Sequence, residues 1–573
     1  MTQAPATEID RNPTAVKLAQ ATLVADAWMQ DFRARRKEFL EHLAGPYYGK
    51  PGFKWAQPLN IIYSIASTIE PALSVRRIRS SVRNTEVPYW FCDRYRAVID
   101  RTLDRLRAAT AMRDAIRESL YAMGILKTAT RENGAIYCEP ISFEHYILDA
   151  KCRGRRPGGY RFEGHHFDMP LEWAMDSGIF AGQDRKEVER LKEEGPAASE
   201  SAETISGTRV VSSDDYEPKI RLVELFLPDR DDPENQRVVW LAGRLNEATR
   251  FLRDVPWHGH EDGPYDVLGY CYIPDNAIPL SIIAVIFGLC LLENALADKS
   301  AEQAKGQKDV VVGKIDTNFT SALRDAMDGA YLGAADPDAV KVVSTGGINE
   351  KNYAAMGYFL DWINRLSRNT DLTGGLRAAS RTLGQDQLLF SQASIGINDM
   401  REAVLEAARS VVRKVAWYLW RDKGLTVNLH QRIPGGIELP GAWEPSVRHG
   451  DFDDYTFDVA SYPKGSDSPE ERYQRLRDLV TSFVVPLAPM AAQTGSYPNA
   501  DVIVNAAGRE LDIPEIEELW IEGEPAGTAG GGTPSAPRAG TPPKPVLPVT
   551  RLAKAPSPIE EMAVAAVQQG NQP

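Results

Sequence analysis

The segment from Ala277 to Asp422 constrains the fold most, because it joins five elements that enzymes rarely combine. It begins with an apolar helix, AIPLSIIAVIFGLCLLENALADKSAEQAKG, and a Val/Lys/Asp-rich strand unit running from QKDVVVGKIDTN through AVKVVSTGG. An amphipathic helix (INEKNYAAMGYFLDWINRLSRN), a polar loop (TDLTGGLRAASRTLGQDQ) and a long helix (LLFSQASIGINDMREAVLEAARSVVRKVAWYLW) complete it. Two helices that leave a body, carry a small β unit at their tip and return are suited to assembly rather than to enclosing a substrate.

The composition is that of a soluble globular protein with an acidic surface. The 573 residues suffice for about three or four structural units, and 43% hydrophobic and 25% charged residues predict a real core. With 66 Lys and Arg against 79 Asp and Glu, the net charge is −13. That sign argues against tight binding of nucleic acid over most of the surface, but it is compatible with DNA that slides past walls of like charge.

Neither a disulfide scaffold nor a membrane span is expected. Pro279 and Gly288 interrupt the apolar run from Ile278 to Leu292, and its length of about 15 residues is short of the ~20 that a bilayer crossing needs. We therefore expect a buried helix there and no membrane partner. The first residues, MTQAPATEIDRNPT, lack the basic and apolar regions of a signal peptide. Five scattered cysteines fit a reducing cytoplasm: Cys92, Cys138, Cys152, Cys271 and Cys290.

Hydrophobic periodicity predicts helices and hairpins before this segment. We expect helices over 14–43 and 58–74, the second capped by Asn60, and one or two helices over 91–124 that end at Gly124. Alternating patterns predict one hairpin joining 125–130 to 134–138 and another joining 219–227 to 236–241, with a charged helix over 185–194 between them.

The region after Asp422 returns to strands and then to helices. We expect strands over 426–433 and 454–463 and helices over 468–491 and 498–511. Beyond about Glu522 the composition becomes rich in Gly, Pro, Ala and Thr, which predicts disorder.

No familiar catalytic motif is present. The segment Gly45–Pro51 is one residue too short for a phosphate-binding loop and has proline in place of the magnesium-binding hydroxyl. His258, His260 and Glu261 lie in a Gly/Pro/Asp loop and could ligate zinc or manganese, but a polar surface turn is the favoured interpretation. The same holds for the segments 164–168 and 449–454. Neither a GxSxG elbow nor an HExxH helix occurs in the sequence.

The order of elements from Pro58 onward resembles that of a tailed-bacteriophage portal (head–tail connector) protein, over roughly residues 30 to 520. PLNIIYSIASTIEPALS is similar to a helix near the start of many portals, and GAIYCEP with FEHYILD resembles a wing strand and the turn that follows it. The block from Ile278 to Leu366 is similar to a stem helix, a clip and a second stem helix. TDLTGGLRAASRTLGQDQLLFSQAS resembles a tunnel loop that enters the long wing helix, and VASYPKGSDSPEERYQRLRDLV resembles the passage to the crown.

This resemblance implies an α+β, portal-like fold that is mainly helical, with a β-rich wing, a small α/β clip, long stem helices and a helical crown. The implied boundaries are 1–277 for the N-terminal helices and wing, 278–306 for stem helix 1, 307–347 for the clip, 348–368 for stem helix 2, 369–387 for the tunnel loop, 388–462 for the long wing helix and returning strands, 463–522 for the crown and 523–573 for the disordered tail.

The resemblance also implies a function without catalysis, cofactor or metal. A homo-oligomeric ring of about twelve copies would sit at one capsid vertex of the virion after assembly in the host cytoplasm. Double-stranded DNA would pass through its channel non-specifically during packaging and ejection. Terminase, head–tail adaptors, and capsid and scaffold proteins would be its partners.

Under this resemblance the second stem helix, about 21 residues and ~32 Å long, supplies contacts between subunits. Its apolar residues crowd two sides, which exceeds what one contact within the chain requires, although packing on the preceding helix alone is the alternative. The expected interface residues are Tyr353, Tyr358, Phe359, Trp362 and Leu366.

The tunnel loop would combine glycines that ease bending with a few cations that touch phosphates transiently. An ordinary connector between helices is the alternative interpretation. The expected channel residues are Arg368, Asn369, Thr370, Asp371, Thr373, Gly374, Gly375, Arg377 and Arg381.

The clip would dock terminase or an adaptor, and its Val-rich strands could pair across subunits. The expected docking residues are Lys308, Val310, Val312, Lys314, Asp316, Arg324 and Lys341. Acidic residues of the stem helices would line the bore: Glu293, Asp298, Glu302, Glu350 and Asp361.

Two other functions remain as alternatives. One is a metal-dependent hydrolase or nuclease that uses the His258/His260/Glu261 loop. The other is a structural capsid or tail adaptor, which the length of the chain and its helix–strand–helix block disfavour.

Overall fold

The computed structural model divides the chain into two compact units, Met1–Ile516 and Glu517–Pro573, and every residue that it describes lies in the first. The described residues are 12–44, 59–153 (without 76, 88 and 132), 159–176, 219–306 (without 230, 231, 247 and 249), 308–313, 340–345, 349–368, 383–422, 424, 427–433, 437–444, 448–459, 477, 478, 481, 482 and 486. Helices and sheets are mixed within these ranges, as an α+β fold requires. The helix expected over 185–194 and the disordered tail lie outside them, as does nearly all of the expected crown.

Four helices open the described chain: α1 (Pro13–Ala44), α2 (Ile61–Leu73), α3 (Tyr89–Arg105) and α4 (Ala108–Tyr121). The side chain of Asn60 accepts a hydrogen bond from the backbone N–H of Tyr63, so the predicted cap of α2 is confirmed. Gly124 does not end a helix as expected. It is the first residue of β2 (Gly124–Thr130), and a Cβ there would lie 2.2 Å from the carbonyl oxygen of Ala115, so only glycine lets the strand approach α4 this closely.

Two antiparallel sheets follow. The first has the order β3-β2-β9, with β3 (Ile136–Ile141) and β9 (Tyr265–Leu268) on either side of β2. The second has the order β4-β5-β6-β7-β8, formed by β4 (Tyr146–Leu148), β5 (Glu163–Pro170), β6 (Lys219–Leu227), β7 (Arg237–Ala242) and β8 (Arg253–Pro256). Both predicted hairpins are confirmed, because β2 pairs with β3 and β6 pairs with β7. The short helices α5 (Leu171–Asp176) and η2 (Pro233–Asn235) connect strands.

A buried ion pair joins the two sheets. The Nζ of Lys127 on β2 lies 2.6 Å from Oε1 of Glu224 on β6, and the indole N–H of Trp240 donates to the other carboxylate oxygen at 3.1 Å. Burial alone would raise the pKa of Glu224, but the Lys127 ammonium, His165 and the hydrogen bonds from Lys127 and Trp240 together lower it to about 2. The pair therefore stays charged and fixes the sheets relative to each other.

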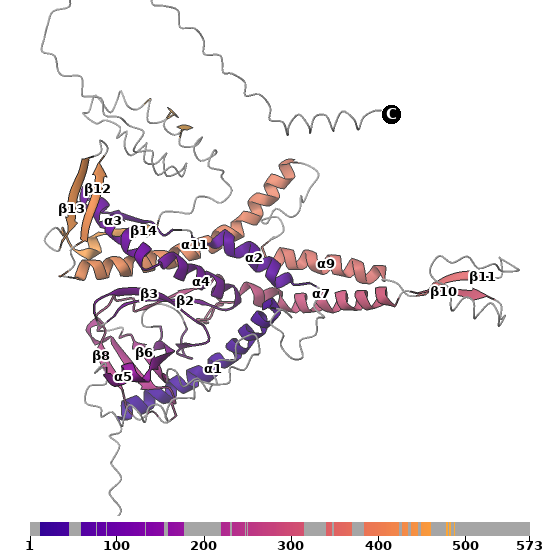
Figure 1. Ribbon diagram of the computed structural model, residues 1–573, viewed down its shortest axis with the longest axis horizontal. Coiled ribbons are helices and arrows are strands. Elements are labelled where there is room, and N and C mark those ends of the chain that lie inside the picture. Colours follow the sequence, from indigo (N-terminus) through magenta and orange to yellow (C-terminus); the bar gives the residue numbers. More distant parts are fainter. Residues whose placement is uncertain are drawn as a thin grey trace, which may run out of the picture. The chain divides into compact units, whose positions relative to one another are not determined.

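The central segment forms α7 (Ile282–Lys305), β10 (Lys308–Gly313), β11 (Val340–Thr345) and α9 (Glu350–Leu366). Figure 1 shows α7 and α9 side by side, with β10 and β11 beyond the end at which the chain leaves α7. The two strands pair antiparallel within the chain, with Val310 opposite Val343. The hairpin of helices tipped by strands is therefore present. Pairing of these strands across subunits stays a prediction.

The chain then enters α11 (Leu383–Arg421), which starts earlier than expected, so residues 383–387 are helical rather than part of a loop. The strands predicted after α11 are confirmed as β12 (Val427–Ile433) and β14 (Thr456–Val459). β13 (Ile437–Trp443), which pairs with β12, was not predicted. The 3-10 turn η5 (Phe452–Asp454) precedes β14, and β14 pairs with β1 (Ser80–Arg83) from the N-terminal region.

One face of α11 forms the centre of the largest hydrophobic core. This face touches α2, α3, β2, β9 and β14, and the Tyr95 hydroxyl of α3 donates to the Ala416 carbonyl at 2.7 Å. Its buried apolar residues are Ile397, Met400, Val404, Leu405, Ala407, Ala408, Val411, Val412, Val415, Ala416 and Leu419. Within the described ranges, no helix combines the length and the hydropathy that a bilayer crossing requires.

Removal of a buried side chain from α11 should destabilise the whole unit. Met400 is fully buried, so Met400→Ala is expected to lower the free energy of unfolding by about 2–5 kcal/mol. Ile395, on the same helix, is 66% exposed, and Ile395→Ala should change it by no more than about 0.5 kcal/mol. Urea unfolding followed by tryptophan fluorescence measures both variants. Equal losses would contradict the central role of this face.

Candidate functional site

The ends of α7 and α9 that lead into β10 and β11 are tied together by polar side chains. Asn349 caps α9 by accepting from the backbone N–H of Lys351 at 2.9 Å. The side-chain oxygen of Gln303 accepts from the backbone N–H of Asn349 at 3.2 Å. Ser300 lies three residues before Gln303 on α7, and its Oγ lies 3.7 Å from the Sδ of Met356, which follows Asn349 on α9. These contacts establish that the helices run antiparallel.

Burial divides α9 into distinct lines along its axis. A helix turns by about 100° per residue, so residues 352, 356, 359 and 363 lie on the line that faces α7. Ile363 on this line is buried, while Met356 and Phe359 are half-buried. The opposite line, with Glu350, Ala354 and Asp361, is exposed. α9, which has 17 residues, is therefore anchored on one side only.

Exposed apolar residues cover both flanks of α9, between the packed line and the opposite line. Tyr358, Trp362 and Leu366 follow one another at intervals of one turn on the first flank, where Tyr358 is 60% and Trp362 41% exposed. Tyr353, which is 70% exposed, and Leu360 lie on the second flank, seven residues apart. Large apolar side chains on two flanks of one helix are typical of a surface that binds protein.

The first flank is ordered by contacts within α9. The rings of Tyr358 and Trp362 meet edge to face, with centroids 6.1 Å apart and an interplanar angle of 71°. The guanidinium of Arg365 lies 5.9 Å from the Trp362 ring centroid and pairs with Asp361 at 2.8 Å. The aromatic surface is therefore partly fixed before any partner binds.

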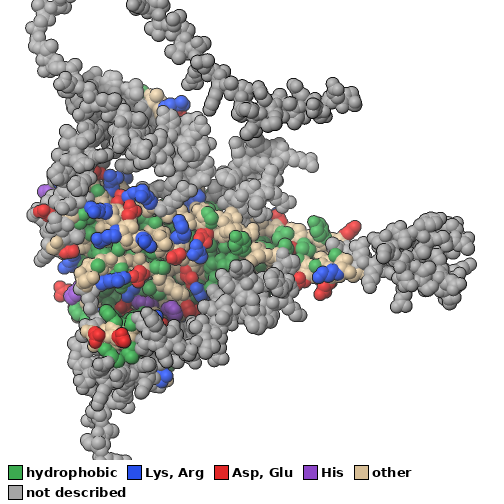
Figure 2. Space-filling model, in the orientation of Figure 1, with side chains coloured by type: hydrophobic (Ala, Val, Ile, Leu, Met, Phe, Trp, Pro, Cys, Tyr) green, Lys and Arg blue, Asp and Glu red, His purple; other side chains and the backbone are tan. Residues whose placement is uncertain are grey.

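α7 also presents apolar side chains away from its packed face. Val285, Leu291 and Leu292 are exposed, and nothing lies within 4 Å of a Cβ placed on Gly288. Figure 2 shows hydrophobic side chains along the α7–α9 pair on its visible face. Val285, Leu291, Leu292 and Leu360 were not among the expected interface residues. Their helical spacing relative to the buried residues was the available signal.

Of the expected channel residues, only Arg368 lies within the described part of the chain. It is not a free cation, because Nη1 donates to the Gly396 carbonyl at 3.3 Å and lies 3.7 Å from the Asp399 carboxylate on α11. Its φ of 69° is in the left-handed region, which costs energy for a residue with a Cβ. Arg368 therefore joins α9 to α11. The expected channel residues outside the described ranges are Asn369, Thr370, Asp371, Thr373, Gly374, Gly375, Arg377 and Arg381.

Four of the expected docking residues lie within the described ranges, and three lie outside them. Lys308, Val310 and Val312 lie on β10, and Lys341 lies opposite Val312 on β11. Lys314, Asp316 and Arg324 lie outside the described ranges.

The acidic residues expected along a bore do not form one surface. Glu302, Glu350 and Asp361 are exposed and Asp298 is half-buried. Glu293 is fully buried, so its placement on the bore was wrong.

The segment 449–454 is an exposed acidic turn apart from the buried Phe452, as expected, whereas the other two histidine clusters differ from the solvated turns expected there. His260 is buried, its Nδ1 accepts the Asp262 backbone N–H at 3.2 Å, and burial lowers its pKa to about 4. His165 lies on β5 with its Nδ1 2.8 Å from the Tyr265 hydroxyl, and burial lowers its pKa to about 3. His258 and Glu261 are exposed, and Glu261 lies 3.6 Å from Arg413. Among the described residues, no group of three His, Cys, Asp or Glu is placed to hold a metal ion.

The sequence matches no protein-family model and no curated protein. Among solved structures, the chain is similar to a chain from the neck of an empty gene transfer agent particle computed with C6 symmetry, at 12% identity and a TM-score of 0.37, covering 80% of this chain and 94% of that one. It is also similar to a chain from the virion of a native gene transfer agent particle, at 10% identity and a TM-score of 0.38, covering 81% and 94%. TM-scores this low do not establish a common fold.

A charge on the first flank of α9 should weaken any self-association through that flank without unfolding the chain. Trp362→Glu is expected to shift the midpoint of self-association upward in concentration by about five- to thirtyfold, because loss of a hot-spot aromatic costs ~1–2 kcal/mol. Mass photometry across a dilution series measures this shift, and circular dichroism confirms folding. Ala354→Glu adds the same charge to the line opposite α7, between the two flanks, and should associate like the wild type. Equal effects from both substitutions would contradict an interface on the flank.

Proposed function

We propose that this chain is the subunit of a phage portal ring, a channel for DNA at one vertex of a capsid. The observation that carries the proposal is the distribution of apolar side chains on α9. One line packs on α7, while Tyr358, Trp362 and Leu366 on one flank and Tyr353 and Leu360 on the other are exposed.

Two different apolar flanks on one element suit a closed ring. In a ring each subunit contacts its neighbours through two unlike surfaces, so every copy needs one patch for each neighbour. A two-fold dimer would need only one self-complementary patch and would leave the second flank in water. The helix pair supports this role because its described residues beyond Ser300 on α7 and before Tyr353 on α9 are not buried by the rest of the chain.

The remaining parts of the proposal concern the partners of the ring. Terminase during packaging, and head–tail adaptors afterwards, would dock on the unit that includes β10 and β11. Capsid and scaffold proteins would contact the body. DNA would pass without sequence-specific contacts, since a ring of about twelve chains of charge −13 repels the phosphate backbone. No catalytic step by this chain is part of the proposal.

Native mass spectrometry of the purified full-length chain tests the ring directly. The expected result is one dominant high-mass species of fixed copy number, about twelve, because a closed ring has no free end at which further copies can add. A chain that remains a 63.4 kDa monomer at all concentrations and salt conditions would contradict the proposal. A series of masses without a limit, as an open filament gives, would contradict it too.

A further inference from the structure

Glu293 is the most unusual buried group of the α7–α9 pair. Its side chain is fully buried, and among the described residues neither carboxylate oxygen has a hydrogen-bond partner. A buried carboxylate without a partner is strongly disfavoured in its charged form, whereas a protonated carboxyl is neutral. The protonation state of Glu293 therefore determines whether its side chain is stable in this buried position.

The helix register places Glu293 in the seam between α7 and α9. Ser300 of α7 contacts Met356 of α9, and the helices are antiparallel. Seven residues back along α7 from Ser300 therefore correspond to seven residues forward along α9 from Met356, which puts Glu293 level with the buried Ile363. Ala297, one turn further along α7, is also buried. Apolar groups thus border the carboxyl along the seam.

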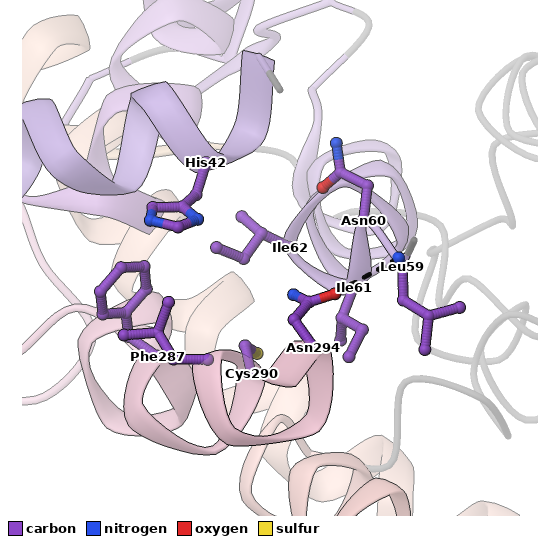
Figure 3. Close-up of a pocket in the computed structure, with 9 residues that line it drawn as sticks. His42, Leu59, Asn60, Ile61, Ile62, Phe287, Cys290 and Asn294 are labelled. Atoms are coloured by element: carbon purple, nitrogen blue, oxygen red, sulfur yellow. Dashed lines mark hydrogen bonds between the residues drawn. The ribbon is translucent and has the colours of Figure 1, made fainter. Parts of the chain in front are cut away.

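The turn of α7 that holds Glu293 also packs against α1 and α2. Phe287, Cys290 and Asn294 of α7 line a small pocket with residues of these two helices, and Figure 3 shows His42 of α1 above Phe287. The ring centroids of His42 and Phe287 are 5.0 Å apart, and the side-chain oxygen of Asn294 accepts the Leu59 backbone N–H at 3.3 Å. These contacts of His42 and Asn294 are with Phe287 and Leu59 rather than with Glu293.

The ion pairs on the elements packed against α7 do not include Glu293. Asp361 and Arg365 of α9 pair with each other, Glu70 of α2 pairs with Arg117 of α4, and Arg36 of α1 pairs with Glu118 of α4. The titratable group that interacts with Glu293 among the described residues is the Cys290 thiol on the same helix, whose pKa burial raises to about 12. No cation in these elements is therefore placed to stabilise the ionised carboxylate.

We propose that Glu293 is a proton-dependent switch of the α7–α9 seam, closed when the carboxyl is protonated and opened locally when it ionises. In the closed state the neutral carboxyl fits between the helices. On ionisation the carboxylate gains solvation only if the helices separate or admit water, since the described residues offer it no counter-charge. The switch lies within one chain and does not depend on the proposed ring.

The direction of the pH dependence follows from the burial. Burial raises the pKa of Glu293 above the ordinary value of 4.5 in the closed state. The closed seam therefore has its full stability at pH values below 4.5 and loses stability as the pH rises toward the raised pKa. At pH values above the raised pKa, the stability of the closed seam no longer changes with pH.

Hydrogen exchange of the full-length chain tests the switch. After correction for intrinsic exchange rates, the protection of amides in α7 and α9 should fall as the pH rises above 4.5 and become level above the raised pKa, with a total fall of about tenfold for each unit by which burial raises the pKa. Glu293→Gln cannot ionise and should show no fall. Glu302→Gln, an exposed glutamate on the same helix, should behave like the wild type. A fall that persists in Glu293→Gln would overturn the proposal, as would level protection in the wild type.

A spectroscopic measurement covers the case in which Glu293→Gln does not fold. The infrared carbonyl stretch of a protonated carboxylic acid should be present in the wild-type chain at pH values where exposed glutamates are ionised, and it should weaken in Glu293→Met. Absence of that change in a folded Glu293→Met chain would overturn the proposal. Both measurements concern one chain, whereas native mass spectrometry measures the ring, so the two proposals fail separately.

Discussion

The burial of one face of α11 is the constraint on which the described structure depends. This face brings together elements that are hundreds of residues apart in the sequence, from α2 and α3 to β14. Lys414 on the same helix is buried and pairs with Asp266 of β9 at 2.8 Å, which also fixes the three-stranded sheet to α11. Such a pair adds little net stability, but loss of one partner would leave a buried charge. The helix pair α7–α9 is thus joined to a well-packed core.

The apolar side chains of α7 pack against two different parts of the chain. Ile283, Ile286 and Phe287 pack into the body, whereas the later turns around Ala297 and Ser300 pack on α9. The described residues of α7 beyond Ser300 and of α9 before Tyr353 are not buried, so the pair extends past the core that supports it. The flanks of α9 then remain available to other molecules. A stable core at the base of the pair and apolar flanks that stay exposed along α9 suit the ring subunit proposed above.

Sequence periodicity predicted the elements well and the environments of individual side chains poorly. The helices α1 to α4, the two hairpins and α7 followed from spacing and capping residues such as Asn60, because these are local effects. β13 was missed, since IELPGAW contains Pro and Gly and its pairing with β12 is a tertiary contact. Glu293 and His260 were misplaced, and the contacts of Arg368 with α11 were not foreseen, for the same reason. An ionisable residue is assigned to the surface by default, and only the packing of other elements shows that it is buried or paired.

A cryo-electron microscopy image of the assembled chain, viewed along its symmetry axis, tests the central claim most directly. The claim is that α7 and α9 of every copy stand next to those of the neighbouring copies around a shared axial hole. The account predicts a closed ring whose central opening is bordered by these helix pairs, with the flank of Trp362 against an adjacent copy. A ring in which the helix pairs point away from the axis, or in which their flanks touch only solvent, would contradict it.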